Sequence, residues 1–218
     1  MINIKRVLDF LTQINLNNNR EWFTLHKDTY SEINSEIKEL TAQLIIEISH
    51  FDNMFNLKVE DCLYRIYRDV RFSPDKSPYK TYIGIYVCKG GKKSSLPGYY
   101  LHFQPGQCMV SGGVYLPTKE QLNEIRTVIY NDPQPYLDIV NKDSFKNNFI
   151  MSVEGKLKTA PKGFDKNFEY IDILRNVNFV PMHFYTDAQV LEPDFIKSAI
   201  DMLANLKEYN NYLLNIID

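Results

Sequence analysis

The sequence predicts a single α+β domain, in which a central antiparallel sheet of about four to six strands packs against a long N-terminal helix and C-terminal helices. Three observations predict this fold class. Apolar residues recur at helical spacing over the first fifty residues, short aromatic segments separated by turn residues follow, and helical spacing then returns. A length of 218 residues suits one domain, which we divide into helical residues 1–52, sheet residues 60–116 and mixed helical residues 117–218.

Two helices are predicted in the N-terminal part. Residues 3–16 carry apolar side chains three and four positions apart, as one face of a helix requires. Asn18, with Glu21 three residues later, resembles a capping box that starts the next helix. Because the apolar spacing continues without interruption, we expect one long helix over residues 19–51 that backs a sheet.

The middle of the chain predicts strands. Alternating or continuous apolar and aromatic residues are bounded by turn signals such as Ser73-Pro74-Asp75, Gly90-Gly91 and Pro105-Gly106. Short connections without helices favour antiparallel pairing. The strands are predicted at residues 63–67, 82–87, 98–103 and 108–115, with a last one at 178–185.

Helices are predicted again after Pro117. Thr118 is a good N-cap for a helix that ends near Tyr130, before Asp132-Pro133. Pro193 is predicted to open the final helix. Two short helices are expected between them, at residues 136–140 and 144–149.

The composition limits the classes of function. The net charge of −2 and the pI near 6.1 disfavour a dedicated nucleic-acid binder, which is usually strongly basic. Three cysteines without a C-x-x-C pattern, no signal peptide and no apolar run long enough for a membrane span predict a cytoplasmic protein without membrane association. No metal-ligand, Walker A, G-x-G-x-x-G or G-x-S-x-G pattern occurs, so we expect neither a metal nor a cofactor.

The most informative segment is residues 65–80, which read RIYRDVRFSPDKSPYK. Five basic side chains face only two aspartates there, and guanidinium groups seek planar acceptors such as carboxylate or phosphate. Residues 65–93 together carry a net charge of +6, whereas the rest of the chain carries −8. This imbalance predicts a basic site on an acidic protein.

If this segment is extended, alternate side chains share a face. Arg65, Tyr67, Asp69 and Arg71 would then form an anion cradle, whereas Arg68 would point to the core and need a buried acceptor. The stiff turn would bring further basic groups toward the same space. The predicted ligand-binding residues are Arg65, Tyr67, Arg68, Arg71, Lys76 and Lys80, and the predicted catalytic residues are Asp69, Tyr79 and His102.

The best hypothesis is therefore a site for a small anionic ligand, for example a phosphorylated one, with catalysis left open. Asp69 would orient the arginines or act as a base, and His102 suits a general base in a strand. Two alternatives stay open. The Arg/Asp cluster is structural in an interaction or scaffold protein, or the basic hairpin binds nucleic acid, which the overall charge disfavours. The oligomeric state does not follow from the sequence.

The arginine segment also supports a resemblance. The pattern from Arg65 to Tyr79, R-x-x-R-D-x-R-F-x-x-D-K-x-x-Y, resembles the hallmark of a microbial and fungal family catalogued as domain of unknown function 2461. Further segments are similar, among them NNNREWF at residues 17–23, GYYLH at 98–102 and GGVY at 112–115. The resemblance covers nearly the whole chain and implies a shared single-domain fold, but no activity.

Overall fold

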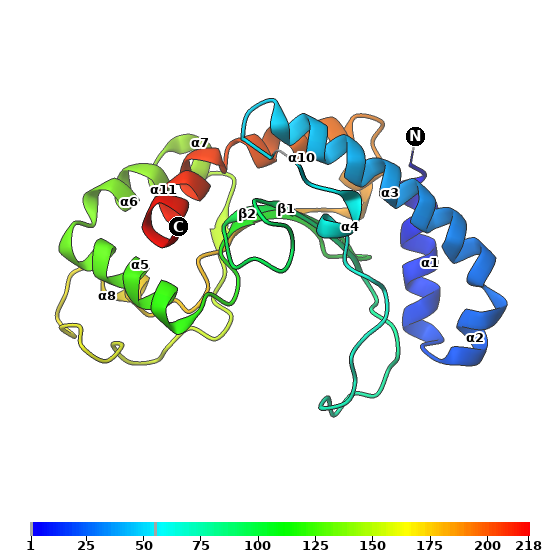
Figure 1. The fold of residues 1–218 in the computed structure, drawn as a ribbon, viewed down its shortest axis with the longest axis horizontal. Helices are drawn as coiled ribbons and strands as arrows, with labels where there is room; N and C mark the ends of the chain where they lie inside the picture. The colour runs from blue at the N-terminus through cyan, green and yellow to red at the C-terminus, as the bar shows by residue number, and fades with distance from the viewer. Residues whose placement is uncertain (1, 55) are drawn as a thin grey trace.

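Helices cover one face of an antiparallel sheet and leave the other face open (Figure 1). The computed structural model describes residues 2–54 and 56–218. Within them the sheet has five strands in the order β1-β2-β3-β5-β4, and every neighbouring pair is antiparallel. The strands are β1 (Ile83–Cys88), β2 (Gly98–Phe103), β3 (Cys108–Gly113), β4 (Ile150–Met151) and β5 (Pro181–Tyr185). The predicted α+β fold class is confirmed.

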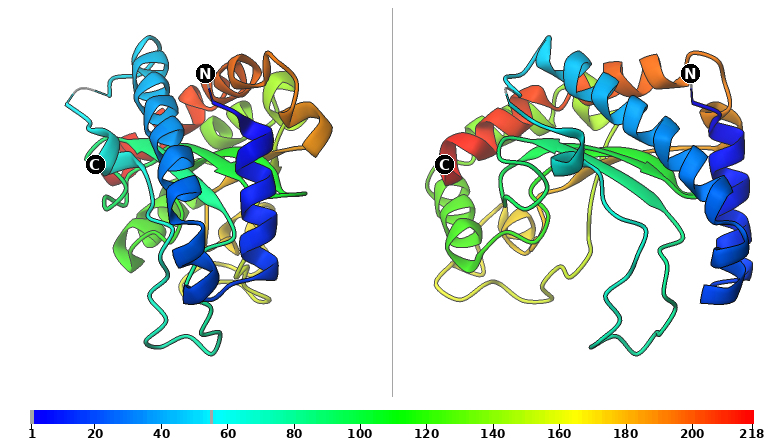
Figure 2. Two further views of the ribbon diagram at one scale, coloured as in Figure 1. Left: turned by 90° about the vertical axis from the view of Figure 1, so that its right-hand side faces the viewer. Right: turned by 45° about the vertical axis from the view of Figure 1, so that its right-hand side comes forward.

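The helices form two groups at the ends of the sheet and a layer across its covered face (Figures 1 and 2). In chain order, the helices before the first strand are α1 (Ile4–Leu16), α2 (Arg20–Leu25), α3 (Lys27–Ser49) and the short α4 (Val59–Cys62). The helices after β3 are α5 (Lys119–Asn131), α6 (Gln134–Val140), α7 (Asp143–Lys146), α8 (Ile171–Leu174), α9 (Asp187–Val190), α10 (Phe195–Ala204) and α11 (Lys207–Ile217). None of these helices has both the length and the apolar character of a membrane span.

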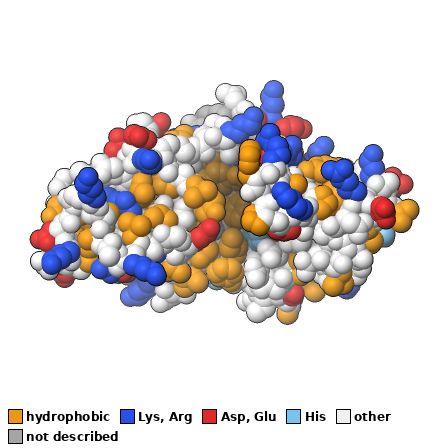
Figure 3. All heavy atoms as spheres, turned by 90° about the horizontal axis from the view of Figure 1, so that it is seen from below, with side chains coloured by type: hydrophobic (Ala, Val, Ile, Leu, Met, Phe, Trp, Pro, Cys, Tyr) orange, Lys and Arg blue, Asp and Glu red, His pale blue; other side chains and the backbone are white. Residues whose placement is uncertain are grey.

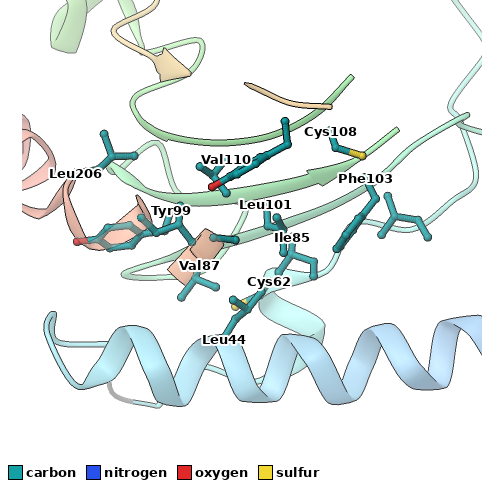
Figure 4. Close-up of a cluster of buried hydrophobic side chains, with 14 of the residues drawn as sticks. Leu44, Cys62, Ile85, Val87, Tyr99, Leu101, Phe103, Cys108, Val110 and Leu206 are labelled. Carbon is teal, nitrogen blue, oxygen red and sulfur yellow. The ribbon is translucent and has the colours of Figure 1, made fainter. Parts of the chain in front are cut away.

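The main core lies between the sheet and the layer formed by α3, α10 and α11. Register places Ile85 opposite Leu101, and Leu101 opposite Val110, so these apolar side chains share one face of the sheet. Figure 4 shows them between the strands and the α3 helix that carries Leu44, with Leu206 to one side, and all five residues are at most 1% exposed. Because side chains alternate along a strand, the intervening residues must face the open side.

The predicted helix over residues 19–51 is wrong in one respect, because it divides at His26 into α2 and α3. The His26 imidazole stacks on the Trp22 indole, with ring centroids 4.0 Å apart. Its Nδ1 lies 2.8 Å from the Trp22 carbonyl oxygen. These contacts hold the bend, which apolar spacing alone does not reveal. The N-cap of α2 is also Asn19 rather than Asn18, since the Asn19 side chain accepts a hydrogen bond from the Trp22 N–H.

The predicted strand at residues 63–67 is also wrong. Only single bridges form there, between Leu63 and Ile85 and between Tyr67 and Tyr79. The chain instead leaves the sheet as a long irregular hairpin that extends from its open side (Figure 2). At the C-terminal end, the predicted final helix stops at Ala204, and α11 follows as a helix that we did not predict.

The two edges of the sheet differ from its centre. At one edge β4 contains two residues, which pair with β5. At the other edge, the Tyr64 N–H donates to the Gly84 carbonyl oxygen of β1 at 3.1 Å, beside the Leu63–Ile85 bridge. Both edges are therefore short or partly covered.

Candidate functional site

An aromatic stack fixes the base of the long hairpin. The Phe23 and Tyr79 rings stack with centroids 4.0 Å apart, and Tyr67 lies against both rings. The Asn18 amide completes the attachment, because its Nδ2 donates to the Tyr79 carbonyl oxygen at 2.9 Å and its Oδ1 accepts from the Tyr79 N–H at 3.1 Å. Two residues of the asparagine run at 17–19 therefore have separate roles. Asn18 holds Tyr79 at the base of the hairpin, and Asn19 caps α2.

Beyond this base, residues 68–78 form a projection that we call the finger. Arg71 binds Asp69 through two hydrogen bonds, Nε–Oδ1 at 2.9 Å and Nη2–Oδ2 at 2.6 Å. Arg68 forms an ion pair with Asp75 and donates to the Ser77 carbonyl oxygen at 3.2 Å. The finger's own carboxylates and carbonyls therefore satisfy both guanidinium groups.

The pKa values of the two aspartates reflect these contacts. The Arg71 hydrogen bonds lower the pKa of Asp69 to about 2. Hydrogen bonds from Ser77, followed by that from Arg68, lower the pKa of Asp75 to about 2. Both carboxylates are ionised at neutral pH, as stable acceptors for arginine require.

The finger ends in an exposed aromatic ring. Phe72 is 95% exposed, and the Arg71 guanidinium carbon lies 6.0 Å from its ring centroid. Lys76, also in the finger, donates to the Val70 carbonyl oxygen at 3.0 Å. The basic groups of the finger thus bind finger atoms, and the arrangement differs from the predicted open cradle.

A pocket of about 420 Å³ lies elsewhere, on the open face of the sheet. Figure 3 views this side of the molecule and shows the central hollow, with many side chains of the hydrophobic class, which includes tyrosine. Five tyrosines contribute to its walls, together with one histidine and small residues of β3. The main lining residues are Tyr64, Tyr82, Tyr86, Lys92, Tyr100, His102, Ser111, Gly112, Gly113, Tyr115 and Glu154. We call this the sheet-face pocket.

Strand alternation positions the lining. Tyr86 pairs with Tyr100, and Tyr100 pairs with Ser111, so the three side chains follow one another across the open face. Gly84 makes room for this packing, because a Cβ there would lie 2.4 Å from the Tyr100 hydroxyl. The Tyr86 hydroxyl donates to the Leu96 carbonyl oxygen at 2.7 Å, which ties the β1–β2 loop to the pocket.

His102 lies in the wall of this pocket and is 8% exposed. Its Nδ1 is 2.8 Å from the Tyr100 hydroxyl and its Nε2 is 3.0 Å from the Gln104 Oε1. The amide oxygen accepts, so Nε2 carries the proton and Nδ1 accepts from the Tyr100 hydroxyl. Tyr82 stacks on the imidazole at 4.8 Å. Both ring nitrogens are therefore occupied, and Tyr100 connects His102 to the pocket.

Burial lowers the pKa of His102 below its ordinary value of 6.5, so the folded protein holds it neutral. When the pH falls through about 6.5, the unfolded chain takes up a proton before the folded one does. The stabilisation from this residue is therefore complete above that pH and is lost toward the lower folded pKa. We expect His102→Gln to flatten the dependence of Tm on pH between about 7.5 and 5.

The control for this prediction is His50→Gln, because the His50 side chain is 69% exposed. That variant should keep the wild-type slope. Thermal melts of the three proteins across the pH range test the expectation, and an unchanged slope in His102→Gln would contradict it.

Basic groups gather beside Tyr64 and Tyr82, two residues that line the sheet-face pocket. The Lys80 Nζ lies 5.1 Å from the Tyr64 ring centroid and 5.6 Å from that of Tyr82. Arg65 and Lys92 are close enough to lower the pKa of Lys80 through charge repulsion, although burial is the larger cause. Lys92 also donates to the Glu60 carbonyl oxygen. In the described parts of the chain, these three cations form no ion pair, unlike Arg68 and Arg71.

The structure divides the predicted site residues into three groups. His102 lines the sheet-face pocket, and Lys80 lies beside its lining residues Tyr64 and Tyr82, with Arg65 near Lys80. Tyr67 and Tyr79 lie in the aromatic stack at the hairpin base. The other four belong to the finger: Arg68, Asp69, Arg71 and Lys76. The catalytic assignments of Asp69, Tyr79 and His102 stay predictions.

Sequence reasoning missed most of the pocket wall. The signal was present, because Tyr86, Tyr100 and His102 occupy alternate positions opposite the apolar face of β1 and β2. Lys92 carried no such signal, since its place depends on how the β1–β2 loop folds over the edge of the sheet. Three buried free cysteines lie outside the pocket lining, and no cluster of potential metal ligands occurs among the described residues.

The fold and pocket define an α+β protein with an aromatic, partly basic site on an open sheet face. The chain belongs to the family described as Conserved hypothetical protein (DUF2461), whose model matches residues 6–212. The predicted family is therefore confirmed. Comparison with curated proteins found no match, and comparison with solved structures found none either.

Proposed function

We propose that the protein binds a small anionic ligand in the sheet-face pocket. Arg65, Lys80 and Lys92 attract the anion, and the surrounding tyrosines contact the rest of the ligand. Tyrosine suits this contact because it offers an apolar ring together with a hydroxyl group. The pocket volume of about 420 Å³ falls in the usual range for small-molecule sites.

The observation that carries the proposal is the group of three cations beside the pocket, Arg65, Lys80 and Lys92, which form no ion pair with a described acidic residue. Five cations and two aspartates occur in residues 65–80. The aspartates are taken by Arg68 and Arg71, and Lys76 binds a backbone carbonyl. The cationic excess is thus left to Arg65 and Lys80, to which Lys92 adds a third charge. Such a cluster is stabilised when an anion binds beside it.

The test is a thermal shift measured with inorganic phosphate and with AMP, with adenosine as the uncharged comparison at matched ionic strength. A ligand at ten times its Kd stabilises the folded state by about 1.4 kcal/mol. For a protein of this size, that energy corresponds to a rise in Tm of roughly 3–6 °C. We expect at least one of the two anions, but not adenosine, to give such a rise.

Variants locate the binding site. Arg65→Met and Lys92→Met should each remove most of the shift, whereas Lys38→Met on the far helical layer should retain it. Arg71→Met separates the pocket from the finger. If Arg71→Met removes the shift while Arg65→Met and Lys92→Met keep it, the anion binds the finger and the proposal is wrong. No shift with either anion would also overturn it.

The structure also bears on the alternative of a protein that binds another macromolecule. The exposed Phe72 ring, with Arg71 beside it, is the feature that favours this alternative. The sheet-face pocket does not depend on it, because the finger and the pocket involve different residues.

A further inference from the structure

Lys80 differs from the other lysines whose contacts are known. Lys5, Lys142, Lys146 and Lys156 form ion pairs, and Lys76 and Lys92 donate to backbone carbonyls. In the part of the chain that the structure describes, the Lys80 ammonium has neither kind of partner and lies near two tyrosine rings. It is half-buried and lies over the rings of Tyr64 and Tyr82, two residues that line the sheet-face pocket.

The groups around Lys80 favour its neutral form. Arg65 approaches from the first arm of the hairpin and Lys92 from the β1–β2 loop, and both carry the same charge as Lys80. The groups nearest to it otherwise are the neutral phenols of Tyr64 and Tyr82. Their faces attract a cation, but burial and the two like charges act in the opposite direction, and the pKa of Lys80 is lowered. A larger share of neutral amine results at neutral pH, as in other nucleophilic lysines.

We propose that Lys80 forms an imine with the carbonyl group of the anionic ligand. This inference rests on the proposed function and narrows the ligand to an anion that carries an aldehyde or ketone, such as a 2-oxo acid. The neutral Nζ attacks the carbonyl carbon and forms a C–N bond. The carbonyl oxygen then leaves as water with the two amine hydrogens, so no oxidant or reductant is required.

The surrounding residues suit this chemistry. Arg65 and Lys92 remain as cations to hold the anionic group while Lys80 reacts, and guanidinium pairs well with a carboxylate or phosphate. The Tyr64 and Tyr82 rings exclude water from one side of the amine, which favours loss of water from the intermediate. Lys80 is thus the attacking group, Arg65 and Lys92 anchor the anion, and Tyr64 and Tyr82 shield the amine from water.

The test is trapping with sodium cyanoborohydride, using glyoxylate as the anionic carbonyl probe and propanal as the neutral one, followed by peptide mass spectrometry. Lys93, an exposed lysine beside Lys92, is the internal comparison. We expect glyoxylate to modify Lys80 faster than Lys93 near pH 7.5, because the lowered pKa of Lys80 leaves a larger share of its amine neutral. Arg65→Met should slow labelling of Lys80 by glyoxylate but not by propanal.

Lys80→Arg keeps the positive charge and cannot form an imine. This variant should therefore lose the adduct at position 80. If glyoxylate labels Lys80 no faster than Lys93 in a protein that still shows the shift, the inference is wrong and the proposed function stands. If propanal prefers Lys80 over Lys93 as strongly as glyoxylate does, the inference that the ligand is an anion is wrong. If neither phosphate nor AMP raises the Tm of the wild-type protein, the proposed function itself is wrong.

Discussion

Replacing Gly113 with alanine is expected to lower the free energy of unfolding by about 3 kcal/mol or more. Gly113 ends β3 with a φ of +78°, a conformation that strains residues with a Cβ. An added Cβ would also lie 1.9 Å from the Phe179 carbonyl oxygen. That oxygen accepts the Val114 N–H, so it cannot move without breaking the connection between the ends of β3 and β5.

Gly106→Ala is the matched control, because Gly106 has a φ of +72° and open space around its Cβ position. The free energy of unfolding of Gly106→Ala should fall only by the cost of the strained backbone conformation, on the order of 1 kcal/mol. Urea unfolding at 25 °C measures both variants, and circular dichroism checks that they are folded. Equal losses in the two variants would show that contact with Phe179 does not limit this position.

The second large effect is expected for Asn210→Leu. Asn210 is 3% exposed on α11, its Oδ1 accepts the Gly113 N–H at 2.8 Å, and its Nδ2 donates to the Gly98 carbonyl oxygen at 2.9 Å. Leucine would leave both backbone groups buried without partners, at about 1–3 kcal/mol each. We therefore expect a loss of about 2–6 kcal/mol and a fall in Tm of roughly 4–24 °C.

Asn215→Leu, on an exposed position of the same helix, controls for helix propensity and should change stability by no more than about 0.5 kcal/mol. Because Gly112 and Gly113 also line the sheet-face pocket, Asn210→Leu should weaken the thermal shift with anions as well. A stability of Asn210→Leu within 1 kcal/mol of Asn215→Leu would mean that the two backbone groups find other partners.

Periodicity was sufficient to predict the layers of the fold. Apolar spacing located α1, α3 and α5, and turn residues separated β1, β2 and β3, because both signals depend on contacts between residues near in sequence. The break at His26 was not predictable in this way. It depends on a ring stack and a side-chain contact to the Trp22 carbonyl oxygen, which leave the apolar pattern unchanged.

The candidate site was also predicted only in part, because local sequence patterns do not show which side chains meet in the folded chain. Counting charges correctly indicated that the arginine segment has more cations than acids, but not which cations would be matched. Asp69 and Asp75 lie two and seven residues from their arginines, and the finger's turn decides which pairs meet. The unmatched cations at Arg65 and Lys80 are those nearest the sheet. Their proximity to Lys92 depends on long-range strand pairing, which no local pattern specifies.

The short and partly covered margins of the sheet have a consequence for neighbouring molecules in concentrated solution. A long unpaired strand would present backbone donors and acceptors to another copy, which is a common route to aggregation. Here β4 offers two residues, and the segment around Tyr64 occupies part of the margin at β1. Intermolecular extension of the sheet is disfavoured, even though the open face and its tyrosines stay accessible to ligands.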